Sequence, residues 1–371
     1  MHEAWARYVK ESGVAMGSIT RRSMLGMMGM GALTLAACGG GSSEGGAESA
    51  GSDAASSDVK LEMITDTGGV NDQSFNQLAW AGMKQMEAEN GWEVSYLESK
   101  QDSDYMTNLD KAVDDGATIV WGIGFAMSDA INTVAEQNPD VTFASIEGSN
   151  EDGKENLTAV AFKSEEPSFA VGYIAARMSE SGKVGFIGGM ESETIQAFEY
   201  GYYAGVEYAN KENGTSVTYQ GQYAESFTDA AKGKSIAQKM IKDGCDVMFH
   251  AAGGAGVGML EACNDAKVMS IGVDQDQAAL FPEYETIITS ALKRVDNAVV
   301  TVSTGLVDGS IEGGQSLLLG AADDAVGLAE SHDKLPDDVY EAAVALFDAI
   351  KAGDIVVPAS KDALDAYVKS L

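Results

Sequence analysis

Residues 68–77 bring together carboxamide side chains, the carboxylate of Asp72 and the aromatic ring of Phe75. Two glycines begin the segment and release the backbone from the preceding strand. Such a turn, at the carboxyl end of a strand, is where open α/β sheets bind ligands. The same residues also fit a plainer structural role, in which Asp72 or Ser74 caps the next helix and Phe75 packs in the core. The local sequence leaves both interpretations open.

Other turns that follow expected strands are also rich in glycine and polar residues. They are residues 122–127, 147–148, 188–190, 226–229, 252–256 and 272–276. Small residues in such turns let a ligand approach backbone amides closely. The spacing Gly254-x-Gly256-x-Gly258 does not match the dinucleotide-binding fingerprint, and the sequence has no P-loop motif. The glycines therefore predict open turns around a neutral polar ligand.

Histidine and cysteine are too scattered to suggest a metal centre. His2, His250 and His332 form no cluster with cysteine, so we expect neither a transition-metal site nor a cofactor. Only His250 could serve a Ser-His-Asp hydrolase, and it ends an apolar strand, where a structural histidine is an equal alternative. Cys245 and Cys263 could form a disulfide outside the cell or remain two buried thiols.

The elements that would position these turns alternate between strand and helix from residue 59 onward. Strands are expected at 61–65, 93–97, 118–122, 142–146 and 157–162, then at 183–188, 216–219, 247–250, 268–273 and 286–291. Helices are expected at 75–89, 105–114 and 127–137, then at 194–210, 229–243, 257–266, 295–307 and 340–352. Such alternation means parallel sheets with right-handed crossovers. The two series predict an α/β protein with two doubly wound lobes.

The first 37 residues are typical of an export signal. Arg21-Arg22 precede an apolar run that is too short to span a membrane. Small residues then lead to Cys38 and resemble the bacterial lipobox, whose cysteine carries diacylglycerol; the segment is compatible with either the general or the twin-arginine route. Residues 38–58 are almost entirely Gly, Ser, Ala, Glu and Asp, which predicts a flexible tether. We therefore expect a lipid anchor on Cys38 at the extracytoplasmic face of the cell membrane.

The composition limits the possible partners. The chain has 24 Lys and Arg residues against 57 Asp and Glu residues, a formal charge of −33. Binding of nucleic acid requires positive side chains that neutralise phosphates, so this acidity argues against it and favours solubility. With 45% hydrophobic residues, the part after the tether can bury a full core, and its length suits two domains of roughly 150 residues each or one large domain.

Five motifs occur in an order that resembles one family. They are Gly-Val-Asn-Asp-x-Ser-Phe-Asn at 69–76, Gly-Phe-Ile-Gly-Gly-Met at 185–190, Ser-Phe-Thr-Asp-x-x-Lys-Gly at 226–233, Ala-Gly-Gly at 252–254 and Ile-Gly-Val-Asp-x-Asp-Gln at 271–277. This series is similar to the basic membrane protein family, also called the purine nucleoside receptor lipoproteins, which serve ABC transporters. The resemblance extends from about residue 60 to residue 307.

The resemblance implies a type I periplasmic-binding-protein fold, with two doubly wound parallel-sheet lobes joined by a three-strand hinge. The N-terminal lobe would contain 59–163 and about 275–291, so that the strand at 286–291 returns to the first lobe. The C-terminal lobe would contain 164–274 and about 292–371. In this fold one ligand lies in the cleft, and the lobes close around it by hinge motion.

The same resemblance assigns contacts with a purine base. Phe75 and Phe227 would stack on its two faces. Asp72 and Asn76 would form hydrogen bonds with its edge, since a carboxylate accepts from ring N–H groups and an amide both donates and accepts. Glu147 stands where the family usually has Asp, and the extra methylene leaves its contact with the base open.

The remaining implied contacts are with ribose. Asp274 would accept from the 2′ and 3′ hydroxyls, Gly253 would bring the backbone to the sugar, and Lys293 would contact it. The resemblance thus implies a lipid-anchored solute-binding protein, not an enzyme, that captures purine nucleosides for the permease subunits of an ABC importer, and we expect it to be a monomer. Two alternatives stay open: the same fold binding a sugar or a signalling molecule, and a nucleoside hydrolase that uses Asp274 and Asp276.

Overall fold

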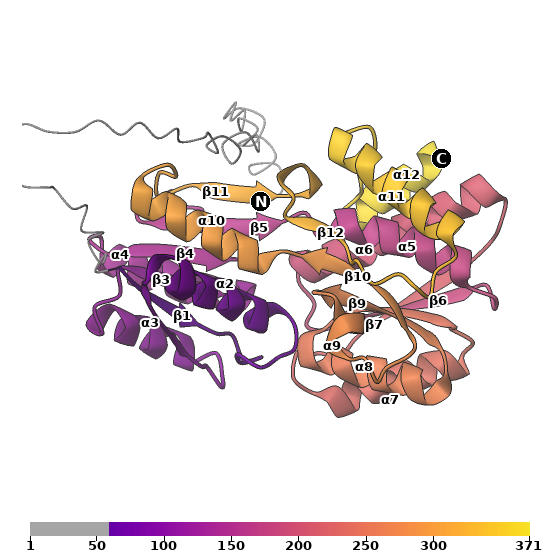
Figure 1. Cartoon of the computed structure of the whole chain (residues 1–371), viewed down its shortest axis with the longest axis horizontal. Coiled ribbons are helices and arrows are strands. Elements are labelled where there is room, and N and C mark those ends of the chain that lie inside the picture. The colour runs from indigo at the N-terminus through magenta and orange to yellow at the C-terminus, as the bar shows by residue number, and fades with distance from the viewer. Residues whose placement is uncertain (1–58) are drawn as a thin grey trace, which may run out of the picture. The chain divides into compact units, whose positions relative to one another are not determined.

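The computed structural model describes residues 59–371 (Figure 1). The export signal predicted for residues 1–37, the lipidation predicted for Cys38 and the tether predicted for residues 38–58 lie outside the described residues. In the described part, strands and helices alternate as predicted and form two lobes, each with one six-stranded sheet. None of the helices in this part is long and apolar enough to cross a membrane.

The first lobe contains the sheet with the order β11-β5-β4-β3-β1-β2, in which every neighbouring pair is parallel. Its strands are β1 (Lys60–Ile64), β2 (Glu93–Leu97), β3 (Ile119–Ile123), β4 (Thr142–Ile146), β5 (Leu157–Phe162) and β11 (Ser316–Leu319). Its helices are α2 (Phe75–Asn90), α3 (Asp104–Asp114), the 3-10 turn η1 (Phe125–Met127), α4 (Ser128–Gln137) and α10 (Val295–Asp308). Helices α2 and α10 cover one face of the sheet, and α3 and α4 cover the other (Figure 1). The central strands are therefore buried on both faces, which explains their continuous apolar sequences.

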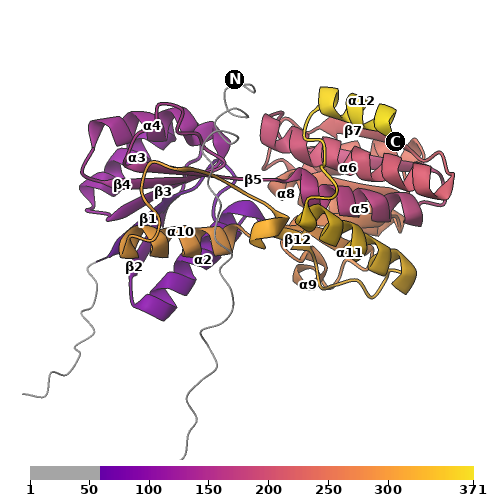
Figure 2. The ribbon, with the colours of Figure 1, turned by 90° about the horizontal axis from the view of Figure 1, so that it is seen from above.

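The second lobe contains the sheet with the order β12-β10-β9-β8-β6-β7, parallel except for β12. Its strands are β6 (Lys183–Gly188), β7 (Thr218–Tyr223), β8 (Val247–Ala251), β9 (Met269–Asp274), β10 (Ile287–Lys293) and β12 (Val326–Leu328). Its helices are α5 (Glu165–Met178), α6 (Glu193–Asn213), α7 (Ala230–Lys242), α8 (Gly253–Ala266), α9 (Gln277–Leu280), α11 (Asp337–Ala352) and α12 (Lys361–Ser370). Helices α5 and α6 cover one face, with α11 against α5 and α12 against α6 (Figure 2), and α7 and α8 cover the other.

The predicted division of the chain between the lobes is wrong for the strand at 286–291. In the structure β10 pairs with β9, with Ser290 opposite Gly272, and so belongs to the second sheet. The chain enters the first lobe only after β10, where α10 packs on α2 and β11 pairs with β5. The first lobe therefore gains residues 295–319 rather than about 275–291. The sequence of a buried strand predicts that a strand forms, but it does not indicate which of the two sheets the strand joins.

Three short connections join the lobes, as the predicted three-strand hinge requires. They follow β5, β10 and β11 (Figure 2). The backbone N–H of Lys163, directly after β5, donates to the carbonyl of Leu319 at the end of β11 at 2.9 Å, which ties the first connection to the start of the third. The N–H of Arg294 donates to the carbonyl of Ala325 at 2.8 Å, which ties the second to the third. The three connections are therefore hydrogen-bonded to one another and form one hinge.

The two cysteines of the described part are separate buried thiols. Cys245 precedes β8, Cys263 lies on α8, and both are free. Burial raises the pKa of Cys245 to about 11 and that of Cys263 further. Of the two alternatives for this pair, the structure contains the buried thiols and not the disulfide.

Candidate ligand-binding site

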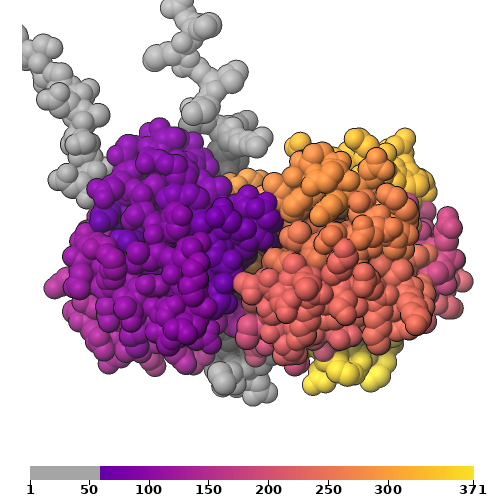
Figure 3. Space-filling model, turned by 90° about the horizontal axis from the view of Figure 1, so that it is seen from below, coloured from indigo at the N-terminus to yellow at the C-terminus, as the bar shows by residue number. Residues whose placement is uncertain are grey.

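A cavity lies where the carboxyl ends of strands from both sheets face each other. Its lining residues come from both lobes and include charged, aromatic and glycine positions. Figure 3 shows the two lobes meeting along a seam on one face. All eight residues predicted to contact a ligand line this one cavity: Asp72, Phe75, Asn76, Glu147, Phe227, Gly253, Asp274 and Lys293.

Asp72 builds the first turn of the site. Its Oδ1 accepts from the N–H groups of Ser74 (2.9 Å) and Gln77 (3.1 Å). Its Oδ2 accepts from the backbone N–H of Asn76 (2.8 Å) and from the side-chain amide of Asn76 (2.9 Å). Burial raises the pKa of Asp72, and these hydrogen bonds oppose the rise. The carboxylate therefore caps α2, and all four of its acceptor positions are occupied by the protein.

Asn76 is engaged in the same turn. Its Oδ1 accepts from the N–H of Asp66 at 3.2 Å, and its Nδ2 donates to Asp66 Oδ1 at 2.8 Å as well as to Asp72. Asp72 and Asn76, the two residues predicted to bind the base edge, thus form their hydrogen bonds within the turn. They line the cavity, but in this conformation they leave little capacity for a ligand.

Asp66 supplies the free acceptor that the sequence reasoning missed. Its Oδ1 accepts from Asn76 and from the N–H of Gly68 (2.8 Å), whereas its Oδ2 accepts nothing from residues 59–371. A Cβ on Gly124 would lie 3.0 Å from this Oδ2, so the glycine leaves the oxygen uncovered. Burial raises the pKa of Asp66 to about 6. Its position, directly after the first strand, was the available signal.

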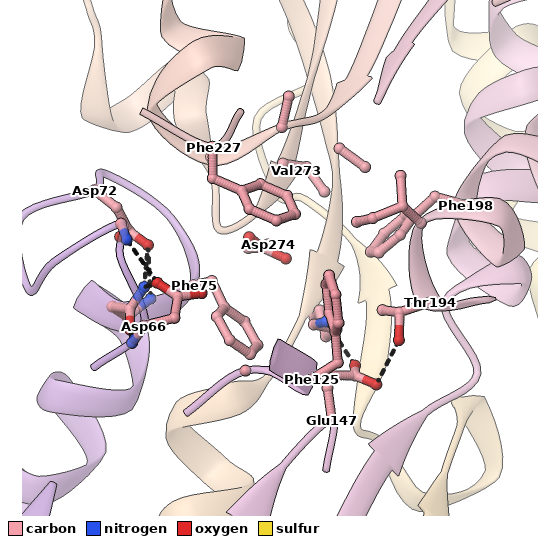
Figure 4. A pocket seen from close by; sticks show the side chains of 18 residues that line it. Asp66, Asp72, Phe75, Phe125, Glu147, Thr194, Phe198, Phe227, Val273 and Asp274 are labelled. Atoms are coloured by element: carbon pink, nitrogen blue, oxygen red, sulfur yellow. Dashed lines mark hydrogen bonds and ion pairs between the residues drawn. The ribbon is translucent and has the colours of Figure 1, made fainter. Parts of the chain in front are cut away.

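Phenylalanine rings from both lobes line the cavity (Figure 4). Phe75 opens α2 in the first lobe, and Phe227 precedes α7 in the second. Phe125 packs edge-on against Phe227, with 6.2 Å between ring centroids, and Phe198 of α6 adds a fourth ring. A Cβ on Gly189 would lie 2.2 Å from the Phe227 ring, so glycine is needed there to seat the ring. The sequence reasoning anticipated two of these four rings.

Asp274 and Lys293 end adjacent parallel strands at the other side of the cavity. Asp274 has a left-handed backbone (φ 66°), and its Oδ2 accepts from the hydroxyl of Ser74 in the first lobe. Burial raises the pKa of Asp274, while Lys293 and the Ser74 hydroxyl oppose the rise. The Lys293 ammonium lies 2.7 Å from Glu147 Oε1 and 4.7 Å from the centroid of the Phe75 ring. Asp274 and Lys293 thus place a buried acceptor and a buried cation at one end of the cavity.

Gly253 brings backbone to the cavity, as predicted, and has a left-handed φ of 50°. A Cβ at this position would lie 3.3 Å from the carbonyl of Phe227, which leaves little room for a side chain. Gly253 begins α8, four residues earlier than the predicted helix.

His250 is a structural residue behind the site. It is fully buried in β8, and its Nε2 lies 2.9 Å from Gln277 Oε1. Burial lowers the pKa of His250 to about 4, so the ring is neutral at pH 7. The Gln277 amide in turn donates to the carbonyl of Gln73 in the first lobe at 3.2 Å. This histidine therefore orients a side chain that joins the lobes, as expected of the structural alternative.

Two α/β lobes, three connections and one cavity between the strand ends define a two-lobed ligand-binding protein with the type I periplasmic-binding-protein fold. Residues 59–361 match the family described as ABC transporter substrate-binding protein PnrA-like. The chain belongs to this family, as the motifs indicated.

Curated relatives and solved structures agree with this assignment. The chain is 37% identical over 353 residues to the CD4+ T-cell-stimulating antigen of Listeria monocytogenes, covering 90% of this chain and 97% of that protein. It is 35% identical over 322 residues to the ABC transporter nucleoside-binding protein BmpA of Lactococcus lactis, covering 81% and 89%. A solute-binding protein of an ABC transporter system from Aeropyrum pernix has a similar structure, with a TM-score of 0.76 and 27% identity, covering 84% and 98%.

Proposed function

We propose that this protein binds purine nucleosides and does not convert them. The observation that carries the proposal is the order of groups along the cavity. Asp66 lies at one side and Glu147 at the other, with the rings of Phe75 and Phe227 between them (Figure 4). A purine nucleoside has a matching order: an edge with N–H donors, a flat aromatic ring system, and a sugar with a diol.

Each part of the ligand finds a suitable partner in this arrangement. Phe75 and Phe227 would stack on the base, a contact that tolerates different substituents. Asp66 accepts from an N–H of the base edge through its free Oδ2. Asp274 keeps its Oδ1 for the ribose hydroxyls while its Oδ2 bonds Ser74, and Lys293 lies beside it. Asp66, in place of Asp72 and Asn76, thus contacts the edge of the base.

The relatives support the class of ligand and the partners. One of them is named as a nucleoside-binding protein of an ABC transporter. We infer that the ligand is delivered to permease subunits of an importer, and that Cys38 carries the lipid that keeps a monomeric receptor on the extracytoplasmic face of the membrane. Metabolic labelling with a fatty acid, lost in Cys38→Ala, tests the anchor.

Titration of the stripped receptor tests the nucleoside. The full-length protein in detergent is unfolded, dialysed and refolded to remove carried ligand, and then titrated calorimetrically with guanosine, inosine, adenosine and ribose. We expect nucleosides to bind far more tightly than ribose. The proposal fails if no nucleoside binds more tightly than about 1 mM, which corresponds to about −4 kcal/mol. Tighter binding of ribose, or turnover of inosine to free base, would instead favour a sugar receptor or a hydrolase.

A pair of matched variants tests the stacking. Phe75→Ala removes a ring that lines the cavity, whereas Phe281→Ala removes a ring that packs on Tyr284 away from it. We expect only the first substitution to weaken nucleoside binding, by about tenfold or more. Equal losses in both variants would mean that general destabilisation, and not stacking, reduces the affinity.

A further inference from the structure

We propose that Glu147 connects the two lobes by positioning Lys293 and by accepting a hydrogen bond from Thr194 of the second lobe. These contacts, called the clasp below, set the affinity for every ligand of the cavity and do not select among bases. The proposal rests on the proposed nucleoside binding for its ligand, but one of its tests needs no ligand.

One carboxylate joins three elements across the cleft. Glu147 follows β4 in the first lobe. Its Oε1 lies 2.7 Å from the ammonium of Lys293 at the end of β10, and its Oε2 accepts from the hydroxyl of Thr194 in the first turn of α6 at 3.3 Å. Both partners belong to the second lobe, and the side chains of Glu147 and Lys293 are only 5% and 4% exposed. Both oxygens are therefore committed to the other lobe.

The backbone of Glu147 is arranged to reach across the cleft. Its N–H donates to the carbonyl of Val160 on β5 at 2.7 Å, and its φ of 59° is left-handed, a region that side-chain-bearing residues rarely adopt. Such a conformation persists where the surroundings fix it, and it is frequent at ligand clamps and switches. A shorter Asp would end about 1.5 Å earlier, which is too short to meet both Lys293 and Thr194 from this backbone.

The clasp also determines where the Lys293 ammonium lies. The side chain is buried among the rings of Phe75, Phe162 and Phe198, with centroids 4.7, 5.3 and 5.4 Å from Nζ. Lys293 also stabilises the charge of Asp274, the nearby carboxylate proposed to hold ribose. By holding Lys293 at 2.7 Å, Glu147 prevents it from pairing fully with Asp274 and keeps the Asp274 Oδ1 available to a ligand.

Substitutions that break only the clasp test its effect on affinity. Thr194→Val removes the hydroxyl and keeps the shape of the side chain, and Glu147→Asp shortens the carboxylate. Guanosine, inosine and adenosine are titrated into the full-length protein in detergent. We expect each variant to weaken all three nucleosides by the same factor, about tenfold for Thr194→Val, because one hydrogen bond to a charged group is lost. Thr133→Val, at a partly exposed position of α4 away from the cavity, serves as the control and should change nothing.

Hydrogen exchange of the unliganded protein tests the clasp independently of nucleosides. Peptides covering 145–149 and 192–198 should exchange several-fold faster in Thr194→Val and Glu147→Asp than in the unmodified protein, while peptides from β8 should not change. A loss of affinity confined to one base, or unchanged exchange in both variants, would overturn the proposal. If no nucleoside binds the unmodified protein but these peptides still respond, the proposed function fails and the clasp stands.

Discussion

Substitution of Asp66 tests the revised assignment of the base contact most directly. Asp66→Asn keeps the shape of the side chain and an oxygen that can still accept from Gly68 and Asn76, but it places an amide donor where Oδ2 faces the cavity. Guanosine and inosine present an N1–H donor, which then meets another donor. Adenosine has a ring acceptor at N1, which the new amide can serve.

The expected loss follows from the contact that disappears. A hydrogen bond to a charged group contributes about 1.5–3 kcal/mol, so Asp66→Asn should weaken guanosine and inosine by roughly 10- to 150-fold and adenosine much less. Titration calorimetry with the three nucleosides measures the change in preference. Asp110→Asn, on the exposed face of α3, is the matched control and should leave all three affinities unchanged.

The raised pKa adds a pH test of the same residue. Because the pKa of Asp66 is about 6, about nine-tenths of the carboxyl groups are protonated at pH 5, and guanosine should bind about tenfold more weakly there than at pH 7.5. Asp66→Asn should remove this dependence. Equal guanosine affinity at both pH values in the unmodified protein, together with unaltered base preference in the variant, would refute the assignment.

The stability of the unliganded protein should change in the opposite direction. The folded-state pKa of Asp66 lies about two units above its ordinary value, so the folded state binds the proton more tightly and its stability falls as pH rises from about 4 to about 6. Replacing the carboxylate should therefore stabilise the protein at pH 7.5, by at most about 3 kcal/mol, and the gain should vanish near pH 4. Thermal unfolding at the two pH values measures this, and a destabilised variant at pH 7.5 would contradict it.

Three further substitutions separate stacking from closure. Phe227→Ala should weaken all purine nucleosides by roughly 10- to 100-fold in calorimetry with little change in the melting temperature, because the ring is only partly buried; unchanged affinity would exclude stacking on this ring. Gly189→Ala should cause a similar loss by displacing that ring, and wild-type affinity would show that the ring can move aside. Ser74→Ala removes the hydroxyl that bonds Asp274 across the cleft and should weaken every nucleoside by about tenfold, whereas an effect on one base alone would contradict a role in closure.

Much of the fold could be predicted because buried parallel strands and amphipathic helices leave strong patterns. The strand expected at 142–146 is β4 to the residue, and the helix expected at 75–89 is α2 with one residue added. Helix α5 was not anticipated: every residue from 166 to 176 is buried, so it shows no polar face and no clear helical period. Short β11 and β12 are likewise too brief to produce a pattern.

The sequence predicted where the site lies, but not which of its carboxylates remains available to a ligand. The turn after β1 was identified from its composition, yet the roles of Asp66 and Asp72 within it depend on which carboxylate meets the N–H groups of α2. The backbone decides this: Gly69 and Gln73 both have left-handed φ values, and the resulting curve turns Asp72 onto the helix end and leaves Asp66 beside the cavity. Such a three-dimensional path is not encoded in the spacing of residue types alone.

Half of the strained non-glycine backbone positions lie where the two lobes meet, which agrees with a protein that binds its ligand by closure. Three of the six non-glycine residues with positive φ in the described part are Gln73, Glu147 and Asp274. Each of them, through its carbonyl or side chain, forms a hydrogen bond to the opposite lobe. Strained backbone persists only where the surroundings hold it, and closing the lobes supplies those bonds. Closure and the shape of the cavity are therefore coupled through the same residues, and a ligand that fits between Phe75 and Phe227 would be favoured by both.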